Sequence, residues 1–406
     1  MDNVLDPQSK RAFFSSRPSS PGHPSAQDYF PALTGIRTVA ATMVFFHHFN
    51  PFTAAKGGRW IQSFVAEWHV GVSIFFVLSG FLICHRYYEE ILSGKQRIWN
   101  YFVNRFGRIY PMYFIVTLLS FLPWICHQPL KEQWRVLLLN LSFLRGLFDE
   151  YKFTGAPAGW SLTVEEMFYA LFPLIILFAR RRRFYLHPVG WIGAGIGLWA
   201  IFRNVHFHGF FGSLSFLFEF TFLGRCVEFY AGMALAFFLR RRRTALIVRN
   251  GMLKTACGTT WIVICIVLLA INRQTASTQG TFLFFETLIN NFCLPWGVIL
   301  LFYGLMTEQN FIVRILSFRL STLLGKASYS FYLIHNGFIF RPLYFAFSQK
   351  IWLVYIALQA ISVILYKCVE RPLHQLIRRK FLIPSTSEGI SFDQADEDAQ
   401  VAGSRQ

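Results

Sequence analysis

The sequence predicts an all-α, polytopic membrane helix bundle with about ten transmembrane spans, and two observations carry this prediction. Of the 406 residues, 54% are hydrophobic and only 15% are charged, whereas a soluble domain has about 25% charged residues. Apolar runs also recur between Leu33 and Val369, each near the length of about 20 residues that crosses a bilayer. The expected spans are 33–51, 69–87, 108–126, 163–179, 187–205, 221–239, 253–272, 282–305, 322–341 and 350–369.

The distribution of charge gives these spans an orientation. The net charge is +18, and the basic residues stand in clusters between apolar runs, as in cytoplasmic loops. Their expected partner is therefore the acidic lipid surface of the bilayer and not nucleic acid. If Lys131–Phe148 does not cross, the loops on the N-terminal side hold 18 Lys and Arg against 10 on the opposite side. We therefore expect both termini in the cytoplasm and an interfacial or re-entrant helix at Lys131–Phe148.

The ends of the chain differ in composition from its middle. Residues 1–30 are rich in Ser, Pro and charge and have no apolar core, so they are expected to be a disordered cytoplasmic segment and not a signal peptide. Residues 31–380 form the expected transmembrane domain, and 381–406 form a disordered acidic tail. Seven scattered cysteines include no C-x-x-C pair, which argues against a metal site or a disulfide framework.

Ionisable residues at membrane depth are costly and are therefore candidates for function. In the first span, Arg37 and His48 are eleven positions apart, so they share a helix face and are separated by about 16 Å along its axis. This span thus places a cation near the inner surface and an imidazole in the outer half. A purely structural hydrogen bond of His48 to a neighbouring helix is the alternative.

The third span begins with a pair of arginines. Arg105 and Arg108 are three positions apart and share a face at the cytoplasmic mouth. Guanidinium groups bind phosphate with bidentate geometry, so this pair is a candidate for holding a phosphate-bearing ligand. The alternative is an ordinary positively charged membrane anchor.

The fourth span opens with Trp160, Ser161, Thr163, Glu165 and Glu166. A structural interpretation exists, because Thr163 and Glu166 fit a capping box and Trp160 fits an interfacial aromatic belt. The predicted topology, however, puts this cluster on the outer side, at the level that His48 approaches. There a carboxylate would hold the imidazole tautomer and stabilise its cation, and Glu165 is the candidate for that role.

Two later spans carry further ionisable groups. Arg225 and Glu228 are three positions apart and are expected to form a structural ion pair within their helix. His335 places a second histidine in the outer half of the ninth span. The sequence contains no G-x-S-x-G elbow, Walker glycine loop or H-E-x-x-H motif.

In their order along the chain, these blocks resemble acyltransferase family 3, whose members are integral membrane proteins that O-acylate sugars and other hydroxylated molecules. The first span resembles the family in its Arg37 and His48, and "GVSIFFVLSGFLI", "RFGRIYPMY" and "WSLTVEEMFYALFP" resemble the blocks that follow. Arg225, Glu228, Phe229 and Gly232 match the next block, and "LGKASYSFYLIH" and "ERPLHQL" close the pattern. The sequence departs at Thr34 and Ser73, where the family often has acidic residues.

The resemblance implies an O-acyltransferase that uses an acyl-CoA, with acetyl-CoA expected, as a co-substrate and acts on a hydroxyl of a carbohydrate or related acceptor. His48 is the expected general base, or an acyl carrier, and Glu165 is expected to orient it. The expected substrate-binding residues are Arg37, Arg105 and Arg108 for the CoA phosphates, and Trp160, Ser161, Glu166 and His335. No metal and no permanently bound cofactor are expected. A transporter of a small polar substrate and a catalytically degenerate family member are the alternatives.

Overall fold

The computed structural model describes residues 29–52, 54–92, 94–127, 130–178, 184–205, 207–241, 248–249 and 251–383. The first half of these residues forms α1 (Pro31–His48), α2 (Ala54–Ala66), η3 (Glu67–Val70), α3 (Gly71–Leu92), α4 (Lys95–His127), α5 (Leu130–Leu141), η4 (Leu144–Leu147), η5 (Asp149–Tyr151), η6 (Pro157–Gly159), α6 (Trp160–Phe178), η7 (Phe184–Leu186) and α7 (His187–Phe202). Except for Tyr29, Phe30 and 381–383, the segments expected to be disordered lie outside the described residues, as does the Arg180–Arg183 run.

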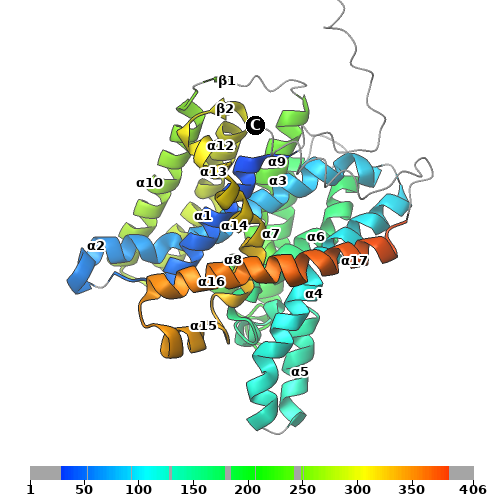
Figure 1. Cartoon of the computed structure of the whole chain (residues 1–406), viewed down its shortest axis with the longest axis vertical. Helices are drawn as coiled ribbons and strands as arrows, with labels where there is room; N and C mark the ends of the chain where they lie inside the picture. Colours follow the sequence, from blue (N-terminus) through cyan, green and yellow to red (C-terminus); the bar gives the residue numbers. More distant parts are fainter. Residues whose placement is uncertain are drawn as a thin grey trace, which may run out of the picture. The chain divides into compact units, whose positions relative to one another are not determined.

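The second half continues as α8 (Leu214–Phe220), α9 (Phe222–Arg241), β1 (Val248–Arg249), α10 (Leu253–Thr275), α11 (Gln279–Thr287), η8 (Leu288–Cys293), α12 (Leu294–Thr307), β2 (Glu308–Gln309), α13 (Phe311–Leu316), α14 (Arg319–Ile334), α15 (Phe340–Pro342), η9 (Leu343–Phe347), α16 (Ile351–Leu365), η10 (Tyr366–Glu370) and α17 (Arg371–Phe381). The strands β1 and β2 form one short parallel pairing. The described chain is thus almost wholly helical (Figure 1).

Seven helical segments in the described chain are long and apolar enough to cross a membrane. They are Gly58–Leu92, Pro157–Phe178, Phe184–Phe202, Leu214–Arg241, Leu253–Thr275, Gln279–Thr307 and Ile351–Phe381. Each contains or overlaps one of the expected spans, so the all-α membrane bundle is confirmed. The other three expected spans fall on α1, α4 and α14. The uncertain segment Lys131–Phe148 contains all but the first residue of α5, which lies beside the end of α4 (Figure 1).

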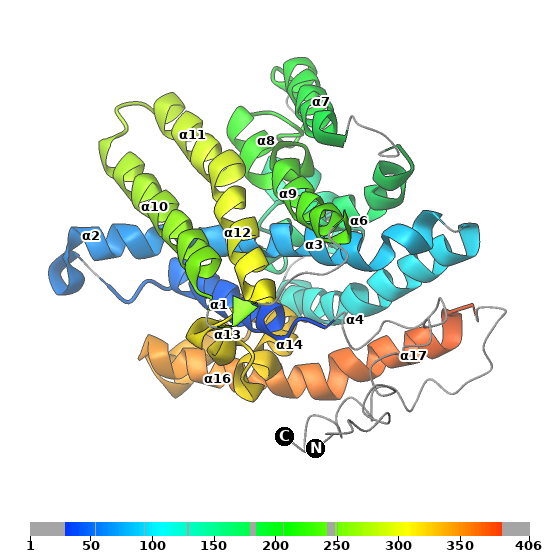
Figure 2. The same cartoon turned by 90° about the horizontal axis from the view of Figure 1, so that it is seen from above.

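The helices α1 and α14 lie at the centre of the bundle. Figure 2 shows α10, α11 and α12 gathered in one group and α6 to α9 in another, with α1 and α14 between these groups and α16. Of all helix pairs, α3 with α9 is packed most extensively. Their backbones approach closely at Gly80 and Gly232, because a Cβ atom at either glycine would overlap a carbonyl oxygen of the other helix. Small residues allow such close helix contacts in membranes.

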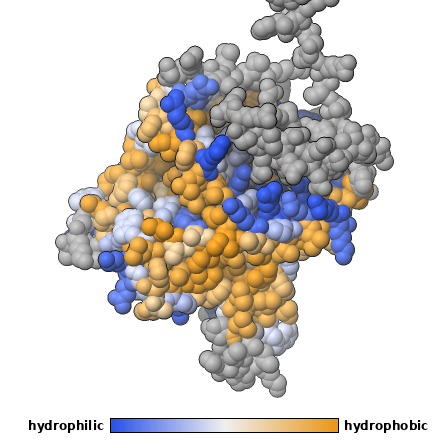
Figure 3. Space-filling view, viewed as in Figure 1, coloured by the Kyte–Doolittle hydropathy of each residue, from blue (hydrophilic) through white to orange (hydrophobic). Residues whose placement is uncertain are grey.

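The outer surface of the bundle is strongly apolar. Large side chains such as Trp352, Ile356, Ile364 and Leu376 are more than half exposed on α16 and α17. Figure 3 shows this apolar face, with hydrophilic residues gathered towards the end of α17, where Arg378, Arg379 and Lys380 occupy the last turn. A largely apolar face of this kind suits contact with lipid and not with water.

Two of the long helices contain π-helical turns, η8 and η10. Such turns insert an extra residue and are frequent at functional sites. In this protein each turn carries buried polar groups, namely Asn290 and Asn291 in η8 and Glu370 in η10. These buried polar groups indicate that the functional site lies in the interior of the bundle.

Candidate functional site

The pairing of α1 with α14 defines the two ends of the candidate site. Arg37 Nε donates a hydrogen bond to Ser328 Oγ at 3.1 Å, and the ring of His48 stacks on that of His335 with centroids 5.3 Å apart. Both pairs join α1 to α14, so the two helices run side by side in the same direction. Arg37 and His48 therefore lie on the face of α1 that packs on α14, about 16 Å apart along the helix.

A group of charged and hydroxyl side chains surrounds Arg37. Glu165 on α6 accepts a hydrogen bond from Ser79 Oγ at 2.8 Å, and Tyr169 donates to Ser79 Oγ at 3.1 Å. Arg37 and Arg108 are the charged neighbours of this carboxylate. They are also the charged neighbours of Glu370, whose Oε2 accepts from Ser330 at 2.7 Å. Four elements, α1, α4, α6 and η10, thus bring two guanidinium groups and two carboxylates together inside the bundle.

Arg105 and Glu166 form a second part of this region. Arg105 Nη2 donates to the Tyr87 hydroxyl at 3.1 Å, and its guanidinium lies 5.1 Å and 6.0 Å from the ring centroids of Tyr87 and Tyr169. Arg105 is also an electrostatic neighbour of Glu166. Its Nε and the Oε1 atom of Glu166 are buried without a hydrogen-bond partner within the described chain. Both groups therefore retain unused hydrogen-bonding capacity.

The basic end of the site contains residues that sequence reasoning missed. His374 on α17 has four guanidinium groups as its charged neighbours. We call these five residues the basic cluster: Arg86, Arg105, Arg108, His374 and Arg378. Atoms Nε2 of His374 and Nε of Arg378 are buried and have no partner among the described residues. Four guanidinium groups, two of which have a buried Nε donor without a partner in the described chain, suit an anionic ligand such as a phosphate.

The sequence held a signal for this part of the site. Glu370, His374 and Arg378 are spaced four positions apart, so they lie on one helix face. This face runs from the end of η10 into α17, and both elements pack on α4, which supplies Arg105 and Arg108. The i, i+4, i+8 spacing of ionisable residues in an otherwise amphipathic segment could have identified it.

The opposite end of α1 carries a group of histidines. We call His47, His48, His69 and His335 the histidine cluster. His48 is exposed at the last position of α1, whereas His335 is 1% exposed. The Tyr332 carbonyl oxygen lies 2.8 Å from His335 Nδ1, so this nitrogen donates and Nε2 carries the lone pair. That Nε2 atom is buried and unpaired within the described part of the chain.

The predicted residues at the start of α6 lie near this end. The hydroxyl groups of Ser161 and Tyr332 are 2.8 Å apart, and Tyr332 is three positions before His335. Trp160 stacks edge-on against Phe220 with ring centroids 4.9 Å apart. Ser161 therefore belongs to the surroundings of His335, whereas Trp160 packs against α8.

The expected contact between Glu165 and His48 is not formed. The charged neighbours of His48 are the other three histidines of the cluster, and Glu165 hydrogen-bonds to Ser79 and Tyr169. The physical reason is depth, because Glu165 lies four positions along α6 from Ser161, or about 6 Å further into the bundle. The capping box was also wrong, since α6 begins at Trp160 and leaves Thr163 buried inside the helix.

The ion pair within α9 is fully buried. Arg225 donates from Nε and Nη2 to the two carboxylate oxygens of Glu228, at 2.7 and 2.8 Å. Its Nη2 also donates to Ser73 Oγ at 3.0 Å, and Ser73 donates to Asn290. Ser73, which stands where the family often has an acidic residue, thus accepts a hydrogen bond from the arginine, and Glu228 is the charged partner of Arg225.

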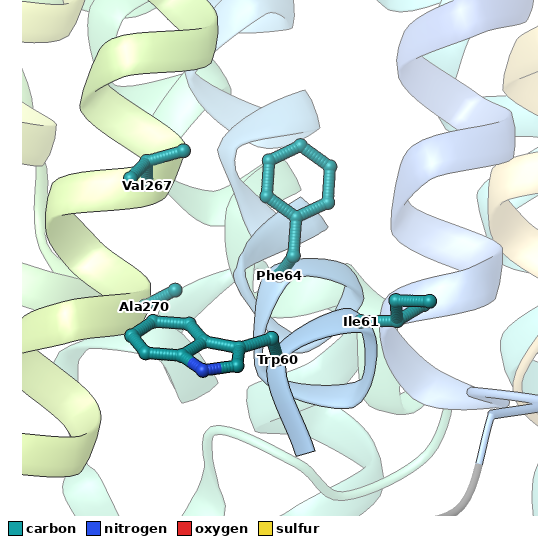
Figure 4. Close-up of a pocket in the computed structure, with 5 residues that line it drawn as sticks. All are labelled: Trp60, Ile61, Phe64, Val267 and Ala270. Carbon is teal, nitrogen blue, oxygen red and sulfur yellow. The ribbon is translucent and has the colours of Figure 1, made fainter. Parts of the chain in front are cut away.

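No group of three or more possible metal ligands occurs among the residues that the structure describes. A small pocket of about 270 Å³ lies between α2 and α10. Figure 4 shows that Trp60, Ile61 and Phe64 line it from α2, and Val267 and Ala270 from α10. This lining offers no acid, base or nucleophile, so the pocket is not the candidate site.

The fold and the site define a polytopic membrane protein with a cationic end and an imidazole end joined through the bundle. The family model described as an acyltransferase domain, acyltransferase family 3, matches residues 30–366. The chain therefore belongs to acyltransferase family 3, and the sequence resemblance is confirmed. No solved structure matches this chain.

Three relatives show how far the likeness extends. The peptidoglycan O-acetyltransferase OatA of Listeria monocytogenes is 27% identical over 172 residues, which cover 37% of this chain and 25% of the relative. The O-acetyltransferase OatA of Staphylococcus aureus is 26% identical over 170 residues, or 38% and 26% of the two chains. A putative O-acetyltransferase of Staphylococcus aureus is 22% identical over 372 residues, or 85% of this chain and 57% of the relative.

Proposed function

We propose that this protein is a membrane-bound O-acetyltransferase that moves an acetyl group from acetyl-CoA to a hydroxyl group of a carbohydrate. Membership of the family supports acyl transfer, and the relatives' names support O-acetylation and a carbohydrate acceptor. Because the matched regions are about a quarter of the OatA chains, the proposal depends on this chain's own geometry. The observation that carries it is the pairing of Arg37 with Ser328 and of His48 with His335 along one helix pair.

The basic cluster is the proposed site for the CoA phosphates. Arg105, Arg108 and Arg378 offer cationic donors, and the Nε atoms of Arg105 and Arg378 are buried without a partner among the described residues. Charge-assisted hydrogen bonds from guanidinium groups to phosphate are among the strongest in proteins. In the ten-span arrangement with both termini in the cytoplasm, this end faces the cytoplasm, where CoA is available. Arg37 and Arg108 then contact the phosphate end of the pantetheine arm beside Glu165 and Glu370, and the thioester extends from there along α1 towards His48.

The histidine cluster is the proposed site of chemistry. His48 is open to an acceptor on its exposed side and is backed by His335. Neutral imidazole suits both roles open to His48, because its unprotonated ring nitrogen can take the proton of an attacking hydroxyl or carry the acyl group itself. The buried Nε2 lone pair of His335 accepts a hydrogen bond from the acceptor hydroxyl and orients it. Ser161 and Tyr332 complete the polar lining at this level.

The decisive experiment measures release of CoA and acetate by purified protein in nanodiscs supplied with acetyl-CoA. We expect His48→Ala to reduce turnover by at least about a hundredfold, the usual effect of losing a general base. His187→Ala is the matched control, because His187 lies at the start of α7, against Tyr230. Normal turnover by His48→Ala at unchanged protein level would refute the assignment, and no acetyl-CoA consumption by the native protein would refute the function.

A further inference from the structure

Beyond His48, a row of ionisable side chains leads away from α14. The ring of His47 lies 4.9 Å from that of His48 and 5.4 Å from that of His69, measured between centroids. His69 Nε2 is 3.8 Å from Glu286 Oε1, and its Nδ1 is 3.6 Å from Glu67 Oε2. Side chains from three elements, α1, η3 and α11, thus form a row of titratable groups in space.

The hydrogen bonds of these histidines show which ring nitrogen is free to accept a proton. His47 Nδ1 lies 2.5 Å from the Ala66 carbonyl oxygen, which can only accept, so Nδ1 donates and Nε2 holds the lone pair. His69 Nε2 is buried without a hydrogen-bond partner within the described chain. The distances from the His69 ring nitrogens to the two carboxylates, 3.6 Å to Glu67 and 3.8 Å to Glu286, both exceed that of a direct hydrogen bond. His69 therefore lies near both carboxylates without a direct hydrogen bond to either of them.

The two carboxylates beside His69 differ in their freedom. The Glu67 side chain is 2% exposed and is paired with Arg273 of α10, whereas the Glu286 side chain is 14% exposed. Glu67 is thus a fixed anion that positions His69, and Glu286 is the more accessible end. The other charged groups near His69 and Glu286 are Arg225 from α9 and Glu219 from α8. A structural ion pair alone would not require three imidazoles leading to a partly exposed carboxylate.

We propose that His47, His69 and Glu286 carry away the proton that the acceptor hydroxyl loses at His48. The inference rests on the proposed function and adds a two-step transfer. In the first step a ring nitrogen of His48 attacks the thioester carbonyl, and the C–S bond breaks. The CoA thiolate then takes a proton from water on its own side. His48 is left as an acyl-imidazolium cation.

In the second step the hydroxyl oxygen attacks the acyl carbon, and the C–N bond to His48 breaks. The ester forms, His48 returns to neutral imidazole, and the hydroxyl proton passes to His47, then to His69 and Glu286. One proton is consumed at the donor end and one is released at the histidine end, so the charges balance. His47, His69 and Glu286 provide the path by which the released proton leaves the site.

The test uses water as the acceptor, so that it does not depend on the identity of the sugar. Native protein in nanodiscs is mixed with acetyl-CoA, and the first rapid release of CoA is measured separately from steady-state acetate formation. We expect His69→Gln and Glu286→Gln to leave the first release unchanged and to slow the steady state by about tenfold or more. Added imidazole, a small diffusible base, is expected to restore the lost rate.

The controls separate this inference from simpler explanations. His208→Gln and Glu150→Gln change an exposed histidine–carboxylate pair elsewhere and are expected to match the native protein. Full steady-state rates in both relay variants would overturn the proton path, as would a loss of the first CoA release that imidazole cannot restore. Failure of the proposed function gives a different pattern, in which the native protein releases no CoA or His48→Ala retains the first release.

Discussion

Arg37 on α1 donates a hydrogen bond to Ser328 on α14 across 291 positions of sequence. This bond fixes a guanidinium beside two carboxylates inside the bundle, Glu165 and Glu370, and Arg108 is the second cation near both. The arrangement ties the cationic end of α1 to the same helix that carries His335. Loss of this hydrogen bond should therefore weaken the binding of acetyl-CoA at the cationic end of the site.

Replacing Arg37 by lysine keeps the positive charge but removes the planar guanidinium and its Nε donor. A typical hydrogen bond contributes about 1 kcal/mol, so we expect the KM for acetyl-CoA to rise by about fivefold. Ser328→Ala should give the same increase, and the double variant should add little because both changes remove one interaction. Additive effects of the two changes would show that the bond is not shared in this way.

The basic cluster makes a prediction about which part of the donor is recognised. Arg378→Gln should raise the KM for acetyl-CoA by about tenfold, as expected for loss of a charge-assisted hydrogen bond. The same variant should bind acetyl-dephospho-CoA almost as well as the native protein does if Arg378 contacts the 3′-phosphate. Arg371→Gln on the exposed side of α17 is the matched control. Equal losses with both donors would place Arg378 elsewhere on the ligand.

The close contact of α3 with α9 predicts a large effect from a single methyl group. Gly80→Ala would place a Cβ atom against the Phe229 carbonyl, and overpacking of this kind costs about 1–3 kcal/mol. Gly190→Ala on α7 meets no atom within 4 Å and should be neutral or slightly stabilising. Thermal unfolding of the two variants in detergent checks this, and equal melting temperatures would contradict the packing argument.

Glu308 in β2 lies beyond the end of α12 and gives a prediction about acid stability. Burial alone would raise the pKa of this carboxyl, but hydrogen bonds from the Thr255 hydroxyl and from the backbone amides of Lys254 and Thr255 hold the pKa below its usual value. A depressed folded-state pKa adds stability above the unfolded-state pKa of about 4.3, and this stability is lost as pH falls through the folded value.

Glu308→Gln should therefore lower the melting temperature at pH 7 and reduce the further loss of stability below about pH 4. Gln309→Glu, at the neighbouring exposed position, serves as a control for charge alone. A melting temperature that is unchanged at pH 7 would show that the carboxylate does not stabilise the start of α10.

The sequence predicted the helical class and the order of the blocks because apolar length and ionisable groups in apolar runs are local properties. Arg37 and His48 were placed on one face by helix geometry alone, and the structure keeps them on the face that meets α14. The partner of Glu165 was not predictable in the same way. It depends on how deep α6 enters the bundle and on the position of Ser79 on another helix.

His69 and the α17 side of the basic cluster were missed for a related reason. In the sequence, His69 looks like an isolated interfacial residue. Its proposed role depends on Glu67, Glu286 and His47, which the packing of the helices brings near it. His374 and Arg378 stand near the end of the family pattern, beyond the last expected span. Only the packing of α17 against α4 shows that they face Arg105 and Arg108.

The π-helical turn η10 sets the rotation of α17 about its own axis. Each residue of an α-helix turns the chain by about 100°, so removing the extra residue of η10 would swing every later side chain by that angle. His374 and Arg378 would then point away from α4, although the composition of the segment would hardly change. A comparison of relatives that does not allow for the extra residue of this turn would therefore assign the wrong side chains to the basic cluster.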